Sequence, residues 1–192
     1  MASPFSPPRF VRDQDALEAG LVGIKLAACP HCRQVGTLIG HGVLRGYAER
    51  SSASVVRGRR ILCSNRGRRP GCGRTFSVLL STVVPGFVVR TLTLWCFAKA
   101  VLSGLSRRSA WLCEAGASLA LSSGYRLWRR LSAAQSALRS RLWREAPAPS
   151  SSAHEPLAQL VAHLAMVVGA GQDDADLFEA FQRGLGLPLF AR

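Results

Sequence analysis

Acidic residues and lysine are both scarce in this chain of 192 residues. Only 11 aspartates and glutamates accompany 25 lysines and arginines, which gives a formal charge of +14, and Lys25 and Lys99 are the only two lysines. So few acids exclude a neutral or acidic protein and favour a partner that carries negative charge. A GC-rich coding sequence also favours arginine over lysine, so the placement of the charge is more informative than its total.

The excess of positive over negative charge is confined to two adjacent stretches. The net charge is 0 over residues 1–28, +10 over 29–90, +8 over 91–144 and −4 over 145–192. This distribution is expected if residues 29–144 share one polyanion and the C-terminal part of the chain does not.

A long uninterrupted apolar run is also missing. The N-terminus, MASPFSPPRFVRDQDALEAG, has no apolar core of signal-peptide length, so we expect a cytoplasmic protein. The apolar stretch from Phe76 to Leu102 is broken by Pro85-Gly86, Arg90 and Lys99, which favours a buried strand followed by a helix over a membrane span. We therefore expect no membrane partner.

Sequence motifs of catalysis are absent as well. The chain has no glycine-rich phosphate loop, no Ser-His-Asp set and no activated Cys-His pair. His154 and His163 flank or lie on an amphipathic helical segment, where we expect surface residues and not catalysts. The sequence therefore predicts that the protein is not an enzyme.

Four of the six cysteines have the arrangement of a metal site. Cys29 and Cys32 form the C-x-x-C knuckle of CPHC, and Cys63 and Cys72 follow on a second hairpin turn. Because nothing indicates secretion, disulfides are disfavoured. Four thiolates then predict one structural zinc ion, Zn2+, with no open coordination position.

Other roles for these residues stay open. C-x-x-C can be a redox pair, although that motif is expected at the start of a helix in an α/β pattern. His31 or His41 could substitute for Cys63 as a ligand. Cys96 and Cys113 lie in helical segments among Leu, Trp and Phe, and we expect them to pack in the core.

The hydrophobic period changes near the middle of the chain. Between Gly36 and Val78, short β-prone segments alternate with Gly, Ser and Asn, which predicts hairpins of a small antiparallel sheet. From Thr91 the period becomes helical. Apart from one short helix around Gln14–Ala19, we expect helices from Thr91 onwards, over Ser123–Arg144, from Leu157 and from Asp173. In Ser123–Arg144 the predicted apolar stripe is Leu127, Leu131, Ala134, Leu138 and Leu142, and most arginines lie off it.

The cysteine segment resembles a known family. CPHCRQVGTLIGHGVLRGY, the basic strand ending RGRRILCSN, and GCGRTFSVL are together similar to the N-terminal zinc ribbon of many bacterial insertion-sequence transposases. The resemblance covers about fifty residues, of which CGRTFS is the most specific. The chain departs from that family by placing eight residues between Cys63 and Cys72 where the family has two.

Residues Gly104–Leu131 resemble the helix-turn-helix that commonly follows such ribbons. Gly104-Leu105-Ser106 would open the second helix, Ala110 and Leu112 would face the core, and SSGYRLWRRL is similar to the start of a recognition helix. The turn is longer than in the family, and Gly124 stands where a β-branched residue often sits. A serine cap and arginines at one helix end suit phosphates and guanine edges. An ordinary helical bundle with a solvated arginine face is the alternative.

The resemblance implies an α+β fold in which a small antiparallel β zinc ribbon precedes an all-α helix-turn-helix bundle and a C-terminal helical tail. We expect a polar lead-in over residues 1–28, the ribbon over 29–84, the helix-turn-helix-like domain over 87–145, a linker over 146–156 and amphipathic helices over 157–192. The long loop between Cys63 and Cys72 would hold its arginines out as a phosphate-contacting finger. The predicted DNA contacts are Arg57, Arg59, Arg60, Arg66, Arg68, Arg69, Tyr125, Arg126, Arg129 and Arg130.

Transposases need carboxylates that bind two metals in a mixed α/β domain of well over a hundred residues. Only 48 residues follow Arg144, and none of their acids lies on an expected strand. We therefore expect a non-catalytic, zinc-dependent protein of mobile-element origin, associated with the nucleoid. It would bind double-stranded DNA, either to recognise element ends or to regulate transposition. An assembly module for a separately encoded transposase, or a decayed transposase fragment, is the alternative.

Overall fold

The computed structural model describes residues 7–68, 70–150, 154–169 and 176–190. These residues form an α+β protein with a four-stranded sheet and six α-helices. The chain divides into two compact units: Met1–Ala48 with Ser52–Ser81, and Glu49–Ser51 with Thr82–Arg192. Each unit has its own hydrophobic core.

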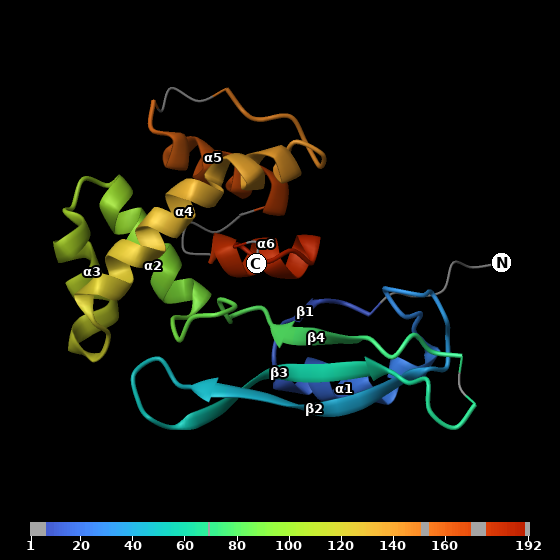
Figure 1. Ribbon diagram of the computed structural model, residues 1–192. Helices are drawn as coiled ribbons and strands as arrows, with labels where there is room; N and C mark the ends of the chain where they lie inside the picture. The colour runs from blue at the N-terminus through green and yellow to red at the C-terminus, as the bar shows by residue number, and fades with distance from the viewer. Residues whose placement is uncertain (1–6, 69, 151–153, 170–175, 191–192) are drawn as a thin grey trace. The chain divides into compact units, whose positions relative to one another are not determined.

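The sheet of the first unit has the strand order β1-β4-β3-β2 (Figure 1). Strands β2 (Leu38–Tyr47), β3 (Ser54–Cys63) and β4 (Thr75–Leu80) pair antiparallel, as the sequence predicts. The short β1 (Phe10–Val11) pairs parallel with the outer edge of β4. The sheet is therefore mixed, and its parallel edge strand comes from the segment that we expected to be a polar lead-in.

The same N-terminal segment supplies part of the core. Helix α1 (Gln14–Val22) begins at Asp13, whose carboxylate accepts a hydrogen bond from Ala16 N, and it lies against β3 and β4 (Figure 1). A short 3-10 helix, Ile24–Leu26, follows. The buried apolar side chains of this core are Leu17, Ile24, Ala27, Leu38, Ile61 and Val78, with Cys29 and Cys63 among them.

The second unit is helical. Its elements are α2 (Thr91–Leu102), α3 (Arg107–Ala115), a 3-10 turn (Gly116–Ser118), α4 (Leu121–Leu142), α5 (Pro156–Val168) and α6 (Leu177–Leu185). Helix α4 packs against both α3 and α5. Its predicted stripe is confirmed: Leu127, Leu131, Leu138 and Leu142 are buried, and Ala134 is partly buried beside them.

Aromatic side chains build the centre of the second unit. The Phe97 ring lies edge-on to Trp111 at 5.1 Å and to Trp128 at 5.8 Å, measured between ring centroids. Trp111 and Ala110 are buried, whereas Leu112 is 48% exposed, so the prediction that Leu112 faces the core is wrong. The large indole of Trp111 points into the core, and the next residue along the helix, Leu112, therefore points to solvent.

Two further predictions about single residues need correction. Cys113 is exposed and Cys96 is only partly buried, so neither is a fully packed core thiol. His163, expected at the surface, is buried at 1% exposure and bonds the carbonyl oxygen of Ala146 through Nε2. No helix among the described residues is both long and apolar enough to cross a membrane.

Candidate metal centre and nucleic-acid interface

Four cysteine sulfurs meet at one end of the sheet in the first unit. Cys29 and Cys32 lie in the turn before β2, Cys63 is the last residue of β3, and Cys72 lies in the β3–β4 connection. The four Sγ atoms all lie within 4.8 Å of one another. The sequence predicted these four residues as a set, and the fold brings all of them together.

The sulfur spacing fits a single tetrahedral ion. Cys29 Sγ and Cys72 Sγ are 3.8 Å apart, and Cys32 Sγ and Cys63 Sγ are 3.6 Å apart. A tetrahedron with metal–sulfur bonds of about 2.3 Å has sulfur–sulfur edges of about 3.8 Å. The cluster could therefore bind one metal ion, and the eight residues between Cys63 and Cys72 do not prevent it.

The first knuckle is a tight turn built from backbone hydrogen bonds. Arg33 N donates to Cys29 O at 2.9 Å, and Cys29 N donates to Gln34 O at 3.0 Å. Arg33 takes a positive φ of 64° to close the turn. His31 N lies 3.4 Å from Cys29 Sγ, while the His31 side chain is exposed. Neither His31 nor His41 belongs to the metal-ligating group found among the described residues.

The second knuckle is closed by the ends of β3 and β4. Gly73 N donates to Cys63 O at 2.9 Å, with Gly73 at a φ of +72°, and Cys72 N lies 3.3 Å from Cys63 Sγ. A Cβ on Gly71 would lie 2.1 Å from Ser64 O and 3.0 Å from Cys63 Sγ, so only glycine fits there. The loop between Cys63 and Cys72 thus brings Cys72 back beside Cys63, where the backbones of Gly71 and Ser64 are in close contact.

Hydrogen bonds favour the thiolate form at one of the four sulfurs, that of Cys63. Burial alone would raise the pKa of the Cys63 thiol, but hydrogen bonds from Thr37 Oγ1, from Cys72 N and from the neighbouring cysteines lower it to about 7. Burial raises the pKa of Cys29 to about 11, against the lowering effect of nearby backbone N–H groups. Thr37 Oγ1 lies 3.1 Å from Cys63 Sγ, a contact that sequence reasoning missed because 26 residues separate the two. Thiolates are the ligand form of cysteine, so metal binding would release protons here.

The arginines predicted for the first unit differ in their exposure and in their contacts. Arg66, Arg68 and Arg60 are exposed. Arg59 instead bonds the Glu18 carboxylate on α1, with Nη2 and Oε1 2.6 Å apart, and Arg57 lies over Gly46 of β2. Arg69 lies outside the described residues. Sequence reasoning missed that Glu18, an acid on α1, pairs with Arg59 of β3.

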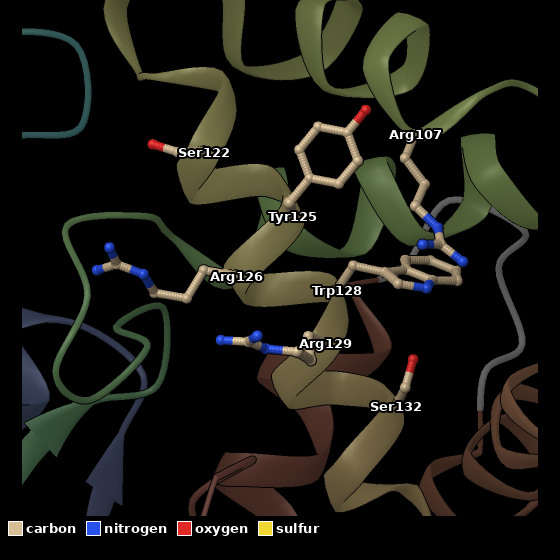
Figure 2. Close-up of a pocket in the computed structure, with 7 residues that line it drawn as sticks. All are labelled: Arg107, Ser122, Tyr125, Arg126, Trp128, Arg129 and Ser132. Atoms are coloured by element: carbon tan, nitrogen blue, oxygen red, sulfur yellow. The ribbon is translucent and has the colours of Figure 1, made fainter.

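In the second unit, three predicted contacts converge on one hollow of about 590 Å³, which we call the arginine hollow. Figure 2 shows Arg126 and Arg129 extending from one side of α4, with Tyr125 one residue earlier. All three side chains are exposed. The hollow is lined by Arg107, Ser122, Tyr125, Arg126, Trp128, Arg129 and Ser132.

Arg107 joins this hollow although the sequence did not single it out. It is the first residue of α3, after the cap Ser106, and its guanidinium carbon lies 5.4 Å from the centre of the Trp128 ring (Figure 2). Arg130 does not join it, because its guanidinium carbon lies 5.2 Å over the Phe87 ring. Arg130 instead lines a separate groove with Arg141.

No protein-family model matches this chain, and comparisons with curated proteins and with solved structures give no match either.

Proposed function

We propose that this chain is a non-catalytic, zinc-dependent protein that binds double-stranded DNA. The observation that carries the proposal is the arginine hollow. Three guanidinium groups and three hydroxyl groups line one concave surface beside the start of α4. Arginine and hydroxyl donors are the side chains that most often contact DNA phosphates.

The helices give this surface a geometry suited to a duplex. Arg126 and Arg129 are three residues apart, so they lie on the same face of α4 and can follow one strand of phosphates. The same face is free to reach base edges, where arginine pairs bidentately with guanine. Together α3 and α4 then serve as a helix-turn-helix pair, with α4 as the recognition helix.

Zinc is the proposed metal because the ligand set is all sulfur. Four thiolates at tetrahedral spacing leave no open position, and that combination suits a structural zinc ion better than a catalytic metal. The ion would hold the two knuckles and the Cys63–Cys72 loop in place, and the exposed Arg66 and Arg68 of that loop would add phosphate contacts. A mobile-element origin and a role at element ends or beside a transposase rest on the sequence resemblance alone.

A salt series measures the DNA contact directly. Binding of the full chain to a labelled duplex is followed by fluorescence anisotropy between about 50 and 200 mM salt, where affinity falls with a slope of about −0.9 per neutralised phosphate. The double variant Arg126→Ala/Arg129→Ala should lower the magnitude of this slope by about 2. Selection from a random pool of duplexes then identifies any DNA sequence that the wild-type protein prefers. The same selection with Arg126→Ala should no longer show that preference.

Arg183→Ala is the matched control, because Arg183 is an exposed arginine of the same unit that does not line the hollow. Its slope should remain close to that of wild type. An unchanged slope in the double variant would remove the hollow from the interface. Failure to bind any duplex at low salt would end the DNA proposal.

A protein partner is a second candidate, favoured by one groove on α4. This groove, of about 570 Å³, has a floor of Ala133, Ala134 and Ala137 beside Leu138, Leu189 and Phe190, and Arg130 and Arg141 at its rim. An acidic segment with one apolar anchor would complement it. Ala137→Glu should abolish such binding and leave the salt slope on DNA nearly unchanged, whereas loss of both would assign the groove to DNA.

A further inference from the structure

Trp143 is the one tryptophan of this chain whose side chain is exposed. Its exposed fraction is 61%, whereas Trp95, Trp111 and Trp128 are all buried. An indole ring offers a wide flat surface on which another planar group can stack. A single exposed apolar ring is common on protein surfaces, so the residues beside Trp143 decide what this ring can bind.

The Trp143 ring borders a second hollow of the helical unit, of about 310 Å³, which we call the Trp143 hollow. Ser136, Arg139 and Ser140 of α4 line the same hollow. Both serines are exposed and Arg139 is half-buried. The volume is at the lower end of the range for small-molecule sites, which suits one flat group of the size of a base. The Trp143 hollow shares no residue with the arginine hollow.

The end of α4 holds this ring in a fixed place. Arg139 and Trp143 are four residues apart, so they lie on one face of the helix. Trp143 N donates to Arg139 O at 2.9 Å, and Glu145 N and Ala146 N both donate to Leu142 O. Because these bonds already order the backbone, a partner that stacks on the indole restricts little further motion.

The surroundings of the ring are basic and polar. Arg139, Arg141 and Arg144 all lie within four residues of Trp143, and Glu145 is the only acid between residues 115 and 154. Polar side chains make up most of the lining of the hollow. A protein partner that covered the indole would need apolar neighbours around it, whereas a nucleic acid supplies a base for the ring and phosphates for the arginines.

We propose that the Trp143 hollow binds single-stranded nucleic acid, with one unpaired base stacked on the indole and Arg139 paired with a neighbouring phosphate. A duplex does not fit this site, because its bases are already paired and stacked on one another. The site therefore goes beyond the duplex surface of the arginine hollow. Arg126 and Trp143 are 17 residues apart, about 25 Å along the helix axis, so both can be occupied independently.

Tryptophan fluorescence of the full chain with zinc present tests the proposal, since a base that stacks on an exposed indole quenches its emission. The probes are an oligothymidylate decamer, an oligouridylate decamer, an abasic decamer with the same phosphates, and a duplex of the same length. We expect both base-containing single strands to quench the emission. The abasic strand should bind at least about fivefold more weakly, because it cannot stack. Tighter binding of the DNA or of the RNA decamer identifies the source of the strand.

Two variants of the ring separate stacking from charge. Trp143→Ala should weaken binding of the oligothymidylate at least about fivefold, measured by the anisotropy of a labelled strand. Trp143→Phe keeps a ring for stacking, so it should bind more tightly than Trp143→Ala while losing the quenching. Tyr47→Ala is the matched control, because the Tyr47 ring is 65% exposed and belongs to the first unit. Its affinity should equal that of wild type.

Arg139→Gln tests the phosphate contact of the same site. One lost contact to a single strand should lower the magnitude of the salt slope by about 0.7. Arg183→Ala, an exposed arginine outside the hollow, should leave that slope unchanged. An unchanged slope in Arg139→Gln would overturn the part assigned to Arg139.

Quenching by single strands that Trp143→Phe removes, together with weaker binding of Trp143→Ala, supports the proposal. It is overturned if neither single strand binds at low salt, if the abasic strand binds equally well, or if Trp143→Ala keeps wild-type affinity. Loss of single-strand binding in Arg126→Ala/Arg129→Ala alone would assign the strand to the arginine hollow and also overturn it. If the duplex fails to bind while the quenching by single strands remains, only the duplex proposal fails.

Discussion

At the residue scale, Cys63 links the metal cluster to the rest of the first unit. Its sulfur lies 3.6 Å from Cys32 Sγ, 3.1 Å from Thr37 Oγ1 and 3.3 Å from Cys72 N. Its backbone also pairs with the strand that follows, through Cys63 N to Arg74 O. The residue whose ligand role the eight-residue spacing left most open thus has the richest set of contacts to its sulfur.

Cys63→Ser should remove the metal. A hydroxyl group is a much weaker zinc ligand than a thiolate, so zinc affinity should fall at least about a hundredfold, more than the loss of an outer-shell partner costs. Native mass spectrometry measures the zinc per chain, expected to be one in wild type. Cys113→Ser, at an exposed cysteine outside the cluster, should retain that zinc. Full zinc occupancy in Cys63→Ser would exclude Cys63 as a ligand.

At the element scale, the crossing of α3 and α4 depends on one glycine. An added Cβ at Gly124 would lie 2.6 Å from Trp111 Cδ2 and 2.7 Å from Trp111 Cγ. Trp111 is held by the edge-on contact with Phe97 and by a bond of 3.4 Å from its Nε1 to Leu119 O. Gly124 thus accommodates the indole that fills this core.

Gly124→Ala should destabilise the second unit by up to about 2 kcal/mol. Overpacking costs about 1–3 kcal/mol, and the better helix propensity of alanine offsets about 1 kcal/mol of it. Gly184→Ala in α6 is the matched control, because nothing lies within 4 Å of the added Cβ. That control should be neutral or up to about 1 kcal/mol more stable. Denaturant unfolding followed by tryptophan fluorescence compares the two, and a stabilised Gly124→Ala would contradict the close contact.

Asp176, the N-cap of α6, makes the stability of this helix depend on pH. Asp176 Oδ1 accepts from Phe178 N and Glu179 N, each at 3.0 Å, while its Oδ2 is buried without a partner. Burial raises the pKa of this carboxyl above its ordinary value of 3.8, although the Thr91 side chain and the backbone N–H groups oppose the shift. A raised folded-state pKa favours the protonated form. The stability contribution is therefore complete below pH 3.8 and is lost as the pH rises through the folded-state value.

Asp176→Asn should remove this pH dependence. Asparagine caps a helix as well as aspartate does but carries no charge to desolvate. The melting temperature of the second unit at neutral pH should stay equal or rise, and it should change less between acidic and neutral pH than in wild type. Asp176→Ala also has no charge to desolvate but loses the cap, a loss that by itself costs about 1 kcal/mol. A lower neutral-pH melting temperature in Asp176→Asn would show that the charge is favourable.

At the scale of the whole molecule, the cysteine cluster and helices α2 to α6 belong to units with separate hydrophobic cores. Cys29 and Cys63 pack in the core of the first unit, whereas the aromatic cluster and the eight buried leucines of α2, α4 and α5 belong to the second unit. The first unit is small and has few large buried side chains, so a bound ion would contribute a large share of its stability.

Chelation should therefore unfold one unit and spare the other. With a strong zinc chelator, hydrogen exchange should accelerate in β2 and β3, while α2 and α4 keep most of their protection. Exchange measured by mass spectrometry on peptides from each unit gives both results in one experiment. The Cys113→Ser protein should behave like wild type in both units. Parallel loss of protection in α4 would mean that the second unit does not fold without the metal.

Much of the architecture follows from patterns that are local in the chain. The C-x-x-C spacing defines a knuckle, short β-prone segments separated by Gly, Ser and Asn predict β2, β3 and β4, and a period of 3.6 residues predicts the buried stripe of α4. The position of the first helix also follows, since Asp13 is a standard cap. These features depend on residues within a few positions of each other, so the sequence by itself determines them.

Only the tertiary structure decides which distant residues meet. It places Cys29 against Cys72 and Cys32 against Cys63, and it pairs Arg59 with Glu18. It also brings Arg107 to the hollow beside Arg126, and it buries His163 against the carbonyl oxygen of Ala146. These partners are separated by many residues, and packing two elements together selects among many possible pairings that no local period distinguishes. The residues of the metal site could therefore be predicted, and so could Tyr125, Arg126 and Arg129, whereas the position of Arg107 beside them in the arginine hollow could not.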